Sequence, residues 1–495
     1  MITDRITSFL GVAPLLLLVA VGLSIMLIDA FSKDRSGLAL TTAMSLFAAA
    51  AISGAIAVRG DLVAPAQITR YLAVDQLGLF FDVVICAGAG LSALLAGGYL
   101  KEHGLERGEF YVLLIFTAFG AMVLARAVDL LSIFLGLETM SLGAYALVAY
   151  RRTSARAVEG AVKYFLLGSF AAAILLFGSA LLYGATGHTD LAGIRDAVGS
   201  GAADPVLTIL ALVMILVSLA FKVGAVPFHM WVPDSYEGAV TPVTTFMSVA
   251  VKAAAFAVLV RVLAGAFGDE VSMDLFTGWT PVIVILAVVT MAWGNLAALA
   301  QSSVKRMLAY SSVAHAGYVL VGLAATYELG PTAVSAVLYY VAAYTVSNVL
   351  AFGSLVLMGS KGKEAVSYED LAGAGRRHPA AAAPFVVGVL SLLGMPPTAG
   401  FFGKYYVFSA AVQAGMTWLA VLGVLASAVG AYYYLKVIVY LFMREPAEDA
   451  PIAVPMRSYY VAAALLLSGY YVLRMGVTPG RYLDFAISAA TTFLG

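Results

Sequence analysis

The sequence contains little charge and almost no cysteine. Asp, Glu, Lys and Arg make up 11% of its 495 residues, whereas a soluble domain carries about 25%. With 62% hydrophobic residues and a mean hydropathy of +0.96, this composition indicates a polytopic membrane protein. The single cysteine, Cys86, excludes a disulfide framework and any iron–sulfur or zinc site built from thiolates of this chain.

Other absences narrow the function. Basic and acidic residues balance at 28 each, which argues against a nucleic-acid partner because such a partner requires a basic face. No Gly-rich dinucleotide fingerprint follows a strand pattern, and no pair of histidines stands with a carboxylate at metal-ligand spacing. We therefore expect neither a metal nor a redox cofactor in this chain, and place any redox cofactor on other subunits.

Long apolar runs fill most of the chain. Runs of roughly 17 to 25 residues, bounded by charge, Gly or Pro, predict fourteen membrane-spanning helices. We interpret the run from Pro14 to Ala30 as the first of these helices rather than a cleaved signal, because no strongly basic segment precedes it. The predicted spans lie near 10–30, 38–58, 76–99, 109–126, 128–149, 159–184, 206–226, 241–266, 280–301, 307–326, 331–359, 384–412, 417–443 and 457–474.

Two of these spans are interrupted, and the interruptions indicate an internal repeat. Gly224 with Pro227 breaks the seventh span, and Gly394 with Pro396 and Pro397 breaks the twelfth. Since proline removes a helical hydrogen bond, each span is expected to form two half-helices, and broken helices at matching places point to a transport site. We predict an all-α polytopic fold with two inverted five-helix repeats, divided into a three-helix segment 1–108, a first repeat 109–266, a second repeat 280–443 and a C-terminal helix and tail 444–495.

Basic residues in the loops predict the orientation. Fifteen of them, including Lys305, follow odd-numbered spans, and eight, including Arg126 and Arg261, lie on the opposite side. By the positive-inside rule the first side is cytoplasmic. Both termini are therefore expected on the outer side of a bacterial inner membrane.

Five basic residues remain inside the spans, and all of them are lysine. An ammonium at bilayer depth costs at least ~2.5 kcal/mol on insertion scales, so its presence favours a function. Lysine can lose its proton when desolvated, whereas arginine effectively cannot. A set that contains only lysine therefore favours proton transfer over mere charge pairing. Its members are Lys163, Lys222, Lys252, Lys404 and Lys436.

Glu138 and Lys222 are predicted to form a buried pair. Glu138 lies nine residues beyond Asp129, or ~13 Å of helix rise, which puts it near mid-membrane. A carboxylate close to the ammonium would keep Lys222 charged, and its withdrawal would favour release of the proton. The alternative is a static pair that only fixes helix packing.

The other candidates follow at different depths. Lys252 lies eleven residues into its span, and Lys404 follows the second break in GMPPTAGFFGKYYVF, where unwound backbone would admit water. His315, mid-span in AYSSVAHAGY, is suited to relay protons, with a hydrogen-bonded structural histidine as the alternative. Lys163 and Lys436 lie near the ends of their helices, and for both the alternative is snorkelling to the interface.

Several long motifs resemble the antiporter-like subunits of respiratory complex I. They are AFKVGAVPFHMWVPDSYEGAVTPVTTFMSVAVKAAAF, YRRTSARAVEGAVKYFLLGSF, SSVKRMLAYSSVAHAGYVL and LSLLGMPPTAGFFGKYYVF, and the resemblance runs through roughly residues 76–445. The N-type branch of this family is the most similar. The M-type carries a glutamate at the second broken helix, where this chain has Lys404, and the L-type carries a long lateral helix after its last spans.

The resemblance implies a proton-translocating subunit in the membrane arm of NADH:quinone oxidoreductase. NADH, FMN, iron–sulfur clusters and quinone would be held by partner subunits, and the membrane partners would be the M-type subunit and the small K-, J- and A-type subunits. Lys436 is added from the internal repeat alone. The family roles fall on Glu138 and Lys222 as the modulating pair, Lys163 and Lys252 as connecting lysines, Lys404 as terminal proton donor and His315 in the link between the halves.

Two other functions stay open at this point. Subunits of multi-subunit cation/proton antiporters share the implied fold, and neighbouring genes would separate them from quinone-reductase subunits. A scaffold that does not pump would keep the normal proton stoichiometry when the lysines are substituted.

Overall fold

The computed structural model describes residues 9–32, 35, 37–60, 64–276, 278–359, 363–446 and 453–495. Arg5, Lys33 and Lys361, three of the basic residues from which the orientation is predicted, lie outside these ranges. Throughout the described ranges the regular structure is helical, and only isolated bridges such as Asp129 with Asp190 link extended residues. The predicted all-α fold is confirmed.

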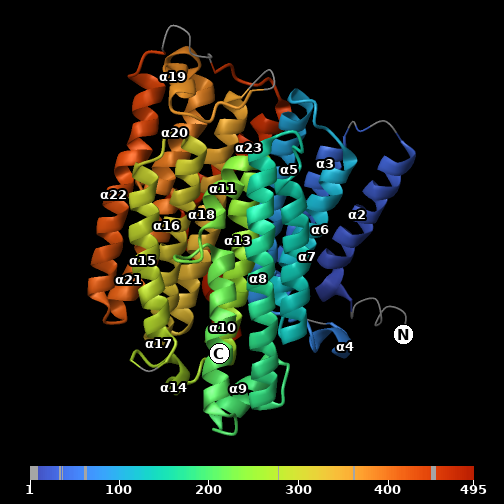
Figure 1. The fold of residues 1–495 in the computed structure, drawn as a ribbon, viewed down its shortest axis with the longest axis vertical. Coiled ribbons are helices and arrows are strands. Elements are labelled where there is room, and N and C mark those ends of the chain that lie inside the picture. Colours follow the sequence, from blue (N-terminus) through green and yellow to red (C-terminus); the bar gives the residue numbers. More distant parts are fainter. Residues whose placement is uncertain are drawn as a thin grey trace.

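The first third of the chain holds an N-terminal group of helices and the start of the first repeat (Figure 1). The N-terminal group is η1 (Leu10–Val12), α2 (Ala13–Phe31), α3 (Leu38–Arg59), α4 (Ala66–Thr69) and α5 (Gln76–Glu102). The first repeat continues with α6 (Gly108–Arg126), α7 (Leu130–Val148), α8 (Ala155–Thr186), α9 (Leu191–Gly199), α10 (Pro205–Val223) and α11 (Trp231–Gly238). It ends with one long helix, Thr241–Ala266, that combines α12 (Thr241–Phe246), the π-helical η2 (Met247–Val251), α13 (Lys252–Val260) and the π-helical η3 (Arg261–Ala266).

The second repeat and the C-terminal helices complete the bundle. The second repeat contains α14 (Glu270–Met273), α15 (Thr280–Leu299), α16 (Val304–Ala324), α17 (Thr326–Leu329), α18 (Pro331–Met358), η4 (Glu369–Leu371), α19 (Ala374–Arg377), α20 (Pro379–Leu393), α21 (Ala399–Gln413) and α22 (Thr417–Phe442). The chain then forms α23 (Tyr459–Val477) and α24 (Pro479–Leu494). The sequence predicted one C-terminal helix and a tail, but the described residues form two helices, because α24 buries Ala486, Ala489 and Ala490 on one face.

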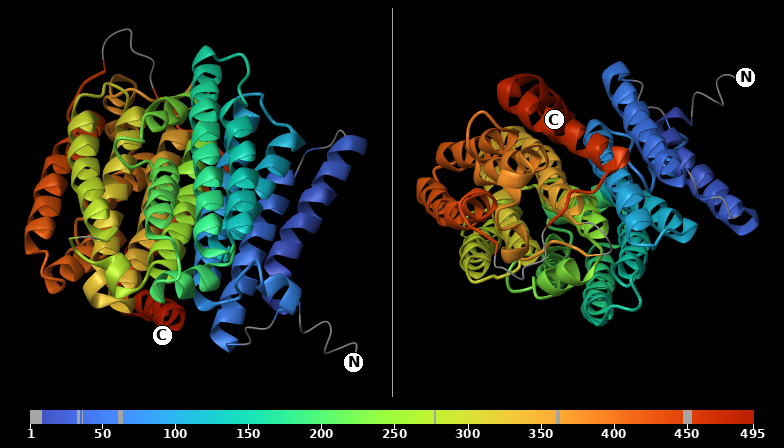
Figure 2. Two further views of the ribbon diagram at one scale, coloured as in Figure 1. Left: turned by 60° about the horizontal axis from the view of Figure 1, so that its bottom comes forward. Right: turned by 90° about the horizontal axis from the view of Figure 1, so that it is seen from above.

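The number of spans agrees with the prediction. Thirteen helices of the described structure are long and apolar enough to cross a membrane. The remaining predicted span, the twelfth, appears as α20 and α21, each of 15 residues, because the break at Gly394 leaves neither half long enough by itself. Figure 2 shows α24 lying across one end of the bundle, where its Phe485 ring packs 5.3 Å from that of Phe80.

Both breaks occur where the sequence places them. The helix α10 ends at Gly224 (φ 76°) and α20 ends at Gly394 (φ 91°), both in the left-handed conformation that glycine adopts without a Cβ penalty. In Figure 1 α11 lies above α10, whereas α21 lies below α20. The two broken helices therefore cross the bundle in opposite directions, as an inverted repeat requires.

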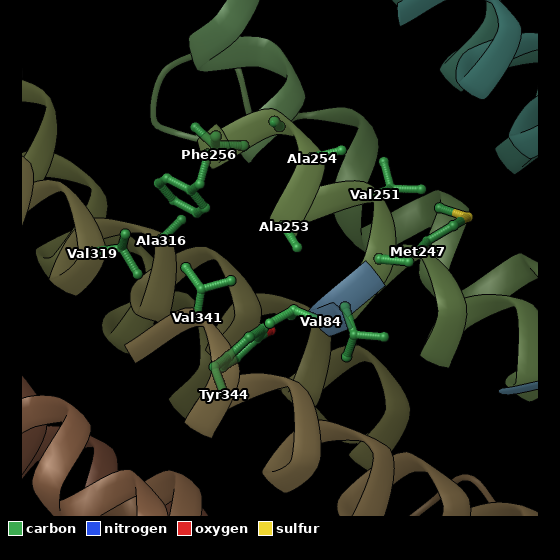
Figure 3. Packing of buried hydrophobic residues seen from close by; sticks show 14 of the residues in the cluster. Val84, Met247, Val251, Ala253, Ala254, Phe256, Ala316, Val319, Val341 and Tyr344 are labelled. Carbon is green, nitrogen blue, oxygen red and sulfur yellow. The ribbon is translucent and has the colours of Figure 1, made fainter. Parts of the chain in front are cut away.

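The helix Thr241–Ala266 forms the centre of the bundle. Its apolar window is completely buried, whereas that of α22 is only 28% buried. Figure 3 shows Ala253 and Phe256 packed towards Val319 of α16 and Val341 of α18. The middle of this helix carries Lys252, so the fold places that lysine at the junction of the two repeats.

We call one end of the bundle the basic end. Arg151, Arg156 and Arg306 surround polar hollows there, and Arg376 donates to the carbonyl of Phe442 at the end of α22. The opposite end holds α9, and the hollow beside α9 is lined by Arg70. These two ends correspond to the two sides that the loop charges distinguish in the sequence.

Candidate functional site

Five predicted site residues lie on five different helices near the middle of the bundle. Each side chain is buried or half-buried, and each helix comes from a different part of the two repeats. Only packing of distant helices brings these residues together. They are Glu138 on α7, Lys222 on α10, Lys252 on α13, His315 on α16 and Lys404 on α21.

Glu138 and Lys222 approach one another without forming a direct ion pair. The Nζ of Lys222 donates to the hydroxyl of Ser141 at 2.7 Å and to that of Tyr145 at 3.4 Å. Ser141 stands one turn along α7 from Glu138, and the buried Oε1 of Glu138 has no hydrogen-bond partner among the described residues. The carboxylate of Glu138 therefore lies within one helical turn of the Ser141 hydroxyl, which is the hydrogen-bond partner of Lys222.

Aromatic rings complete the surroundings of Lys222. The Nζ atom lies 5.5 Å from the ring centres of Tyr145 and Phe221 and 5.7 Å from that of Tyr164. The negative faces of such rings attract a cation and exclude water from it. Lys222 is therefore buried among aromatic rings, with the hydroxyl groups of Ser141 and Tyr145 as its hydrogen-bond partners.

Lys252 contacts the second repeat directly. Its Nζ donates to the backbone carbonyl of Ser312 at 2.6 Å. Lys252, Ser312, His315 and Tyr344 also line one small cavity of about 10 Å³, which is near the least space that holds a single water molecule. The cavity gives Lys252 and His315 a shared polar space between the two halves.

His315 has a tyrosine on each side of its ring. Its Nδ1 lies 2.8 Å from the hydroxyl of Tyr340, and its Nε2 lies 3.0 Å from that of Tyr434. Tyr434 in turn contacts Ser311 at 2.5 Å. On α18, Tyr340 therefore joins a polar chain, while the hydroxyl of Tyr339 donates to the carbonyl of Met475.

Lys404 lies against the second break. Its Nζ donates to the carbonyl of Leu393 and to the hydroxyl of Ser427, both at 2.7 Å. The carbonyl of Leu393 belongs to the last turn of α20, where helical carbonyls lack partners and favour a cation. The ring of Tyr318 lies 5.0 Å from the same ammonium. The broken helix thus supplies the backbone group that holds Lys404.

Lys163 and Lys436 lie apart from this row, at the basic end. Lys163 is 43% exposed and pairs with Asp234 at 2.7 Å and with Glu159 at 2.5 Å. Lys436 lies 4.2 Å from the ring centre of Tyr368. The structure therefore brings neither lysine into contact with the central row, and both are near water, as the snorkelling alternative requires.

A polar cavity of about 660 Å³, which we call the vestibule, opens at the basic end; Lys436 lines it, and so do Asp234 and Glu159, the two partners of Lys163. It lies between the two repeats, because α8 and α11 form one wall and α16 and α22 form another. Charged side chains of both signs line it, among them Arg156, Glu159, Asp234, Glu237, Arg306 and Lys436. A cavity of this size and polarity connects the neighbourhood of Lys163 to solvent.

One sequence inference about the basic residues is wrong. Arg126, Arg261 and Lys305 were assigned to loops, but all three side chains are buried. Arg126 pairs with Asp82, and Arg261 donates to both carboxylate oxygens of Asp75 at 2.7 and 2.8 Å. Buried basic residues are therefore not all lysine. The arginines lie near helix ends where packing against α5 buries them beside an acid, which the apolar pattern alone did not reveal.

Sequence reasoning also missed the neutral partners of the lysines. Ser141, Ser427 and Tyr434 hold the charged groups but carry no charge themselves, so a search for intramembrane charges passes over them. For Ser141 a signal exists, since it stands three residues after Glu138 on the same helical face. No group of three or more His, Cys, Asp or Glu suited to a metal occurs within the described ranges.

Comparison with known sequences assigns most of these elements to one family. Residues 127–430 match the family described as NADH:quinone oxidoreductase/Mrp antiporter. The chain is 55% identical over 503 residues to NADH-quinone oxidoreductase subunit N 1 of Sorangium cellulosum, covering 97% of this chain and 98% of that protein. It is 41% identical to subunit N of Trichlorobacter lovleyi, covering 97% and 96% of the two chains.

Solved structures show the same fold. A chain of respiratory complex I from Thermus thermophilus with bound aureothin superposes with a TM-score of 0.79 at 36% identity, covering 96% of this chain and all of that one. A chain of the Mrp complex from Dietzia sp. superposes with a TM-score of 0.85 at 22% identity, covering 99% and 100%. At that lower identity the likeness shows the fold alone.

Proposed function

The chain belongs to the subunit N family of NADH-quinone oxidoreductases, and from this membership we propose that it translocates protons in the membrane arm of such a complex. Lys222, Lys252 and Lys404 carry the proton, His315 links the halves, and Glu138 controls release. The observation that supports this path best is the row of buried proton-bearing groups across five helices. Ionisable groups this deep in a membrane protein mark ion and proton pathways.

The separation of Glu138 from Lys222 supports a mechanism in which Lys222 changes its partner. Exchange of partners between the Ser141 hydroxyl and the Glu138 carboxylate needs only a rotamer change in Lys222, because both groups stand on one face of α7. With the carboxylate as partner the ammonium is stable. With the hydroxyl as partner, burial favours the neutral amine and the proton leaves. An electrostatic change driven by quinone reduction elsewhere in the complex sets this exchange.

The proton then passes into the second repeat. Lys252 and His315 share the small cavity beside Ser312, whose volume of about 10 Å³ gives room for one water molecule between the two side chains. His315 can take a proton at one ring nitrogen and give one up at the other, since each nitrogen faces a tyrosine hydroxyl. Lys404, beside the second break, is the last donor before the outer side.

The remaining assignments concern the surroundings of this chain. The membrane is the cytoplasmic membrane of a bacterium, with the basic end facing the cytoplasm and both termini on the outer side. NADH, FMN, iron–sulfur clusters and quinone are held by partner subunits. The membrane partners are the M-type subunit and the small K-, J- and A-type subunits. Lys163 and Lys436 act at the basic end rather than in the central row.

Substitution of Lys222 or Glu138 with alanine tests the proposal. In membrane vesicles we expect proton pumping driven by NADH oxidation to fall about tenfold or more in either variant, with NADH:quinone activity falling in parallel. The amount of assembled complex, measured on native gels, should stay unchanged. Full pumping by either variant would overturn the proposal and favour a scaffold.

A further inference from the structure

The two broken helices share the spacing of Gly and Pro at their breaks. In the first, Gly224 ends the half-helix and Pro227 follows three residues later; in the second, Gly394 and Pro397 have the same spacing. Both glycines adopt the left-handed conformation. The register that aligns them pairs Lys404, ten residues after Gly394, with the residue ten after Gly224.

That residue is Asp234. It lies on α11, the second half of the first broken helix, as Lys404 lies on α21, the second half of the second. Because the repeats are inverted, α11 and α21 extend in opposite directions from their breaks (Figure 1). Lys222 has no charged counterpart in this register, since Leu392 occupies the matching position. The repeat thus relates a carboxylate near the basic end to an ammonium on the way to the other end.

Asp234 joins the two repeats at the vestibule. One carboxylate oxygen accepts from Nζ of Lys163 on α8 at 2.7 Å, and the other accepts from Arg306 on α16 at 2.8 Å. The carboxylate is 26% exposed and lines the cavity. It therefore holds a lysine of the first repeat and an arginine of the second at the edge of the vestibule.

The backbone under Asp234 is tightly fixed. A Cβ at Gly160 of α8 would lie 2.7 Å from the carbonyl oxygen of Asp234, so only glycine lets the two helices approach this closely. Ser235 donates to the carbonyl of Gly160 at 3.1 Å and adds a second link. The carboxylate is consequently a rigid feature, and the flexible partner is the long side chain of Lys163.

Lys163 in turn adjoins the pocket of Lys222. The next residue, Tyr164, is buried, and its ring centre lies 5.7 Å from Nζ of Lys222. Lys163 and Tyr164 are thus neighbours on α8: Lys163 pairs with the vestibule carboxylate of Asp234, and the Tyr164 ring borders the pocket of Lys222.

We propose that Asp234 is the positioning residue for proton uptake, holding Lys163 at the vestibule as the inverted counterpart of Lys404. This inference rests on the proposed function. Because Lys163 does not contact the central row, its ammonium gives its proton to a water path that delivers a proton to the neutral amine of Lys222, and the neutral Lys163 is then protonated again from the vestibule. The fixed carboxylate of Asp234 attracts positive charge to the vestibule. It also draws the Lys163 side chain back towards itself after each proton transfer.

The test compares Asp234→Asn and Asp234→Glu in assembled complex in membrane vesicles. We expect Asp234→Asn to lower proton pumping per NADH oxidised about fivefold and Asp234→Glu to keep most of it. The matched control is Asp196→Asn on α9 at the opposite end, whose side chain is 79% exposed and pairs with Arg195 instead of Lys163 or Arg306. It should pump within about twofold of the unmodified chain.

A double substitution separates positioning from mere structural support. If Asp234 acts through Lys163, then Asp234→Asn combined with Lys163→Gln lowers pumping no further than Lys163→Gln alone. Multiplied losses, or normal pumping by Asp234→Asn, would overturn the inference. Lys222→Ala is measured in parallel: if it abolishes pumping while Asp234→Asn does not, only this inference fails, whereas full pumping by Lys222→Ala removes the proposed function itself.

Discussion

His315 lies on α16 beside the small cavity that it shares with Lys252 of the first repeat. A neutral imidazole has one donor and one acceptor nitrogen, and here each nitrogen already faces a tyrosine hydroxyl. A proton arriving at one nitrogen can therefore leave from the other without rotation of the ring. The hydroxyl of Tyr340 is the partner on the α18 side, and Tyr340 also borders the cavity beside Gly403.

Tyr340→Phe tests this arrangement at the residue scale. Loss of the hydroxyl leaves Nδ1 of His315 without its partner at 2.8 Å, while the ring and its packing stay. We expect proton pumping to fall about tenfold, equal to about 1.4 kcal/mol of barrier. Tyr339→Phe is the control, because its hydroxyl bonds Met475 away from the row. Equal pumping by the two variants would exclude Tyr340 from the path.

The sequence identified charged residues well and their partners poorly. Charged groups in apolar runs are conspicuous because hydrocarbon penalises them, and this singled out Lys222, Lys252 and Lys404. Their partners are hydroxyls and a backbone carbonyl, which fit apolar helices at little cost and leave no trace in composition. Which lysines belong together depends on packing between helices far apart in sequence.

At the scale of the element, the left-handed glycines fix where each broken helix stops. A residue with a Cβ costs about 1–2 kcal/mol in that conformation. At Gly394 an added Cβ would also lie 3.0 Å from Cδ of Lys404, so this glycine both ends α20 and leaves room for the lysine.

Gly394→Ala is expected to lower both stability and pumping. The backbone penalty of about 1–2 kcal/mol lowers the melting temperature, and displacement of the Lys404 side chain slows proton transfer. Thermal denaturation of the detergent-solubilised complex and pumping in vesicles measure the two effects. Gly184→Ala is the control, because a Cβ there meets nothing within 4 Å and the residue lies inside α8. An unchanged melting temperature for Gly394→Ala would contradict the assigned strain.

Helix breaks were predictable from sequence, but the last helix was not. Gly and Pro within a long apolar run mark a break directly, which is why Gly224 and Gly394 were found. The C-terminal helix α24 is 16 residues long and has one apolar face. A search for spanning runs does not detect such a helix, since it lies across the bundle instead of through it (Figure 2).

On the scale of the whole molecule, Glu364 joins the two repeats at the basic end. Its carboxylate accepts from the backbone and the hydroxyl of Thr241 in the first repeat and lies 3.5 Å from Lys305 in the second. Burial opposes ionisation of Glu364, but Lys305 and Thr241 outweigh it and hold the pKa of Glu364 below its ordinary value. Folding therefore stabilises the ionised form of Glu364.

Glu364→Gln should destabilise the protein by about 3 kcal/mol at neutral pH, because the buried Lys305 loses its counter-charge. The depressed pKa means that the stabilisation is complete above about pH 4.3, the ordinary glutamate value, and is lost as the pH falls through the lower folded value. The gap in melting temperature between the two proteins should therefore narrow in acid. Glu369→Gln, at an exposed site of the same segment, serves as control; a gap independent of pH would contradict the assignment.

The overall architecture was predictable, whereas contacts between the halves were not. Apolar runs and two matching breaks suffice for an inverted-repeat helical bundle. Glu364 and Thr241 are separated by 123 residues, and nothing in either local sequence indicates the other. The same holds for Asp234 and Arg306, 72 residues apart. Such pairs become visible only when the two repeats are docked.

The complete burial of the helix Thr241–Ala266 has a consequence for biogenesis. The carbonyl that receives the Lys252 ammonium belongs to Ser312, which the ribosome makes 60 residues later. Until then the nascent helix carries an unpartnered charge, at a cost of about 3 kcal/mol on insertion scales. The first repeat therefore cannot mature alone: its central helix must be sheltered at the insertion machinery until α16 arrives.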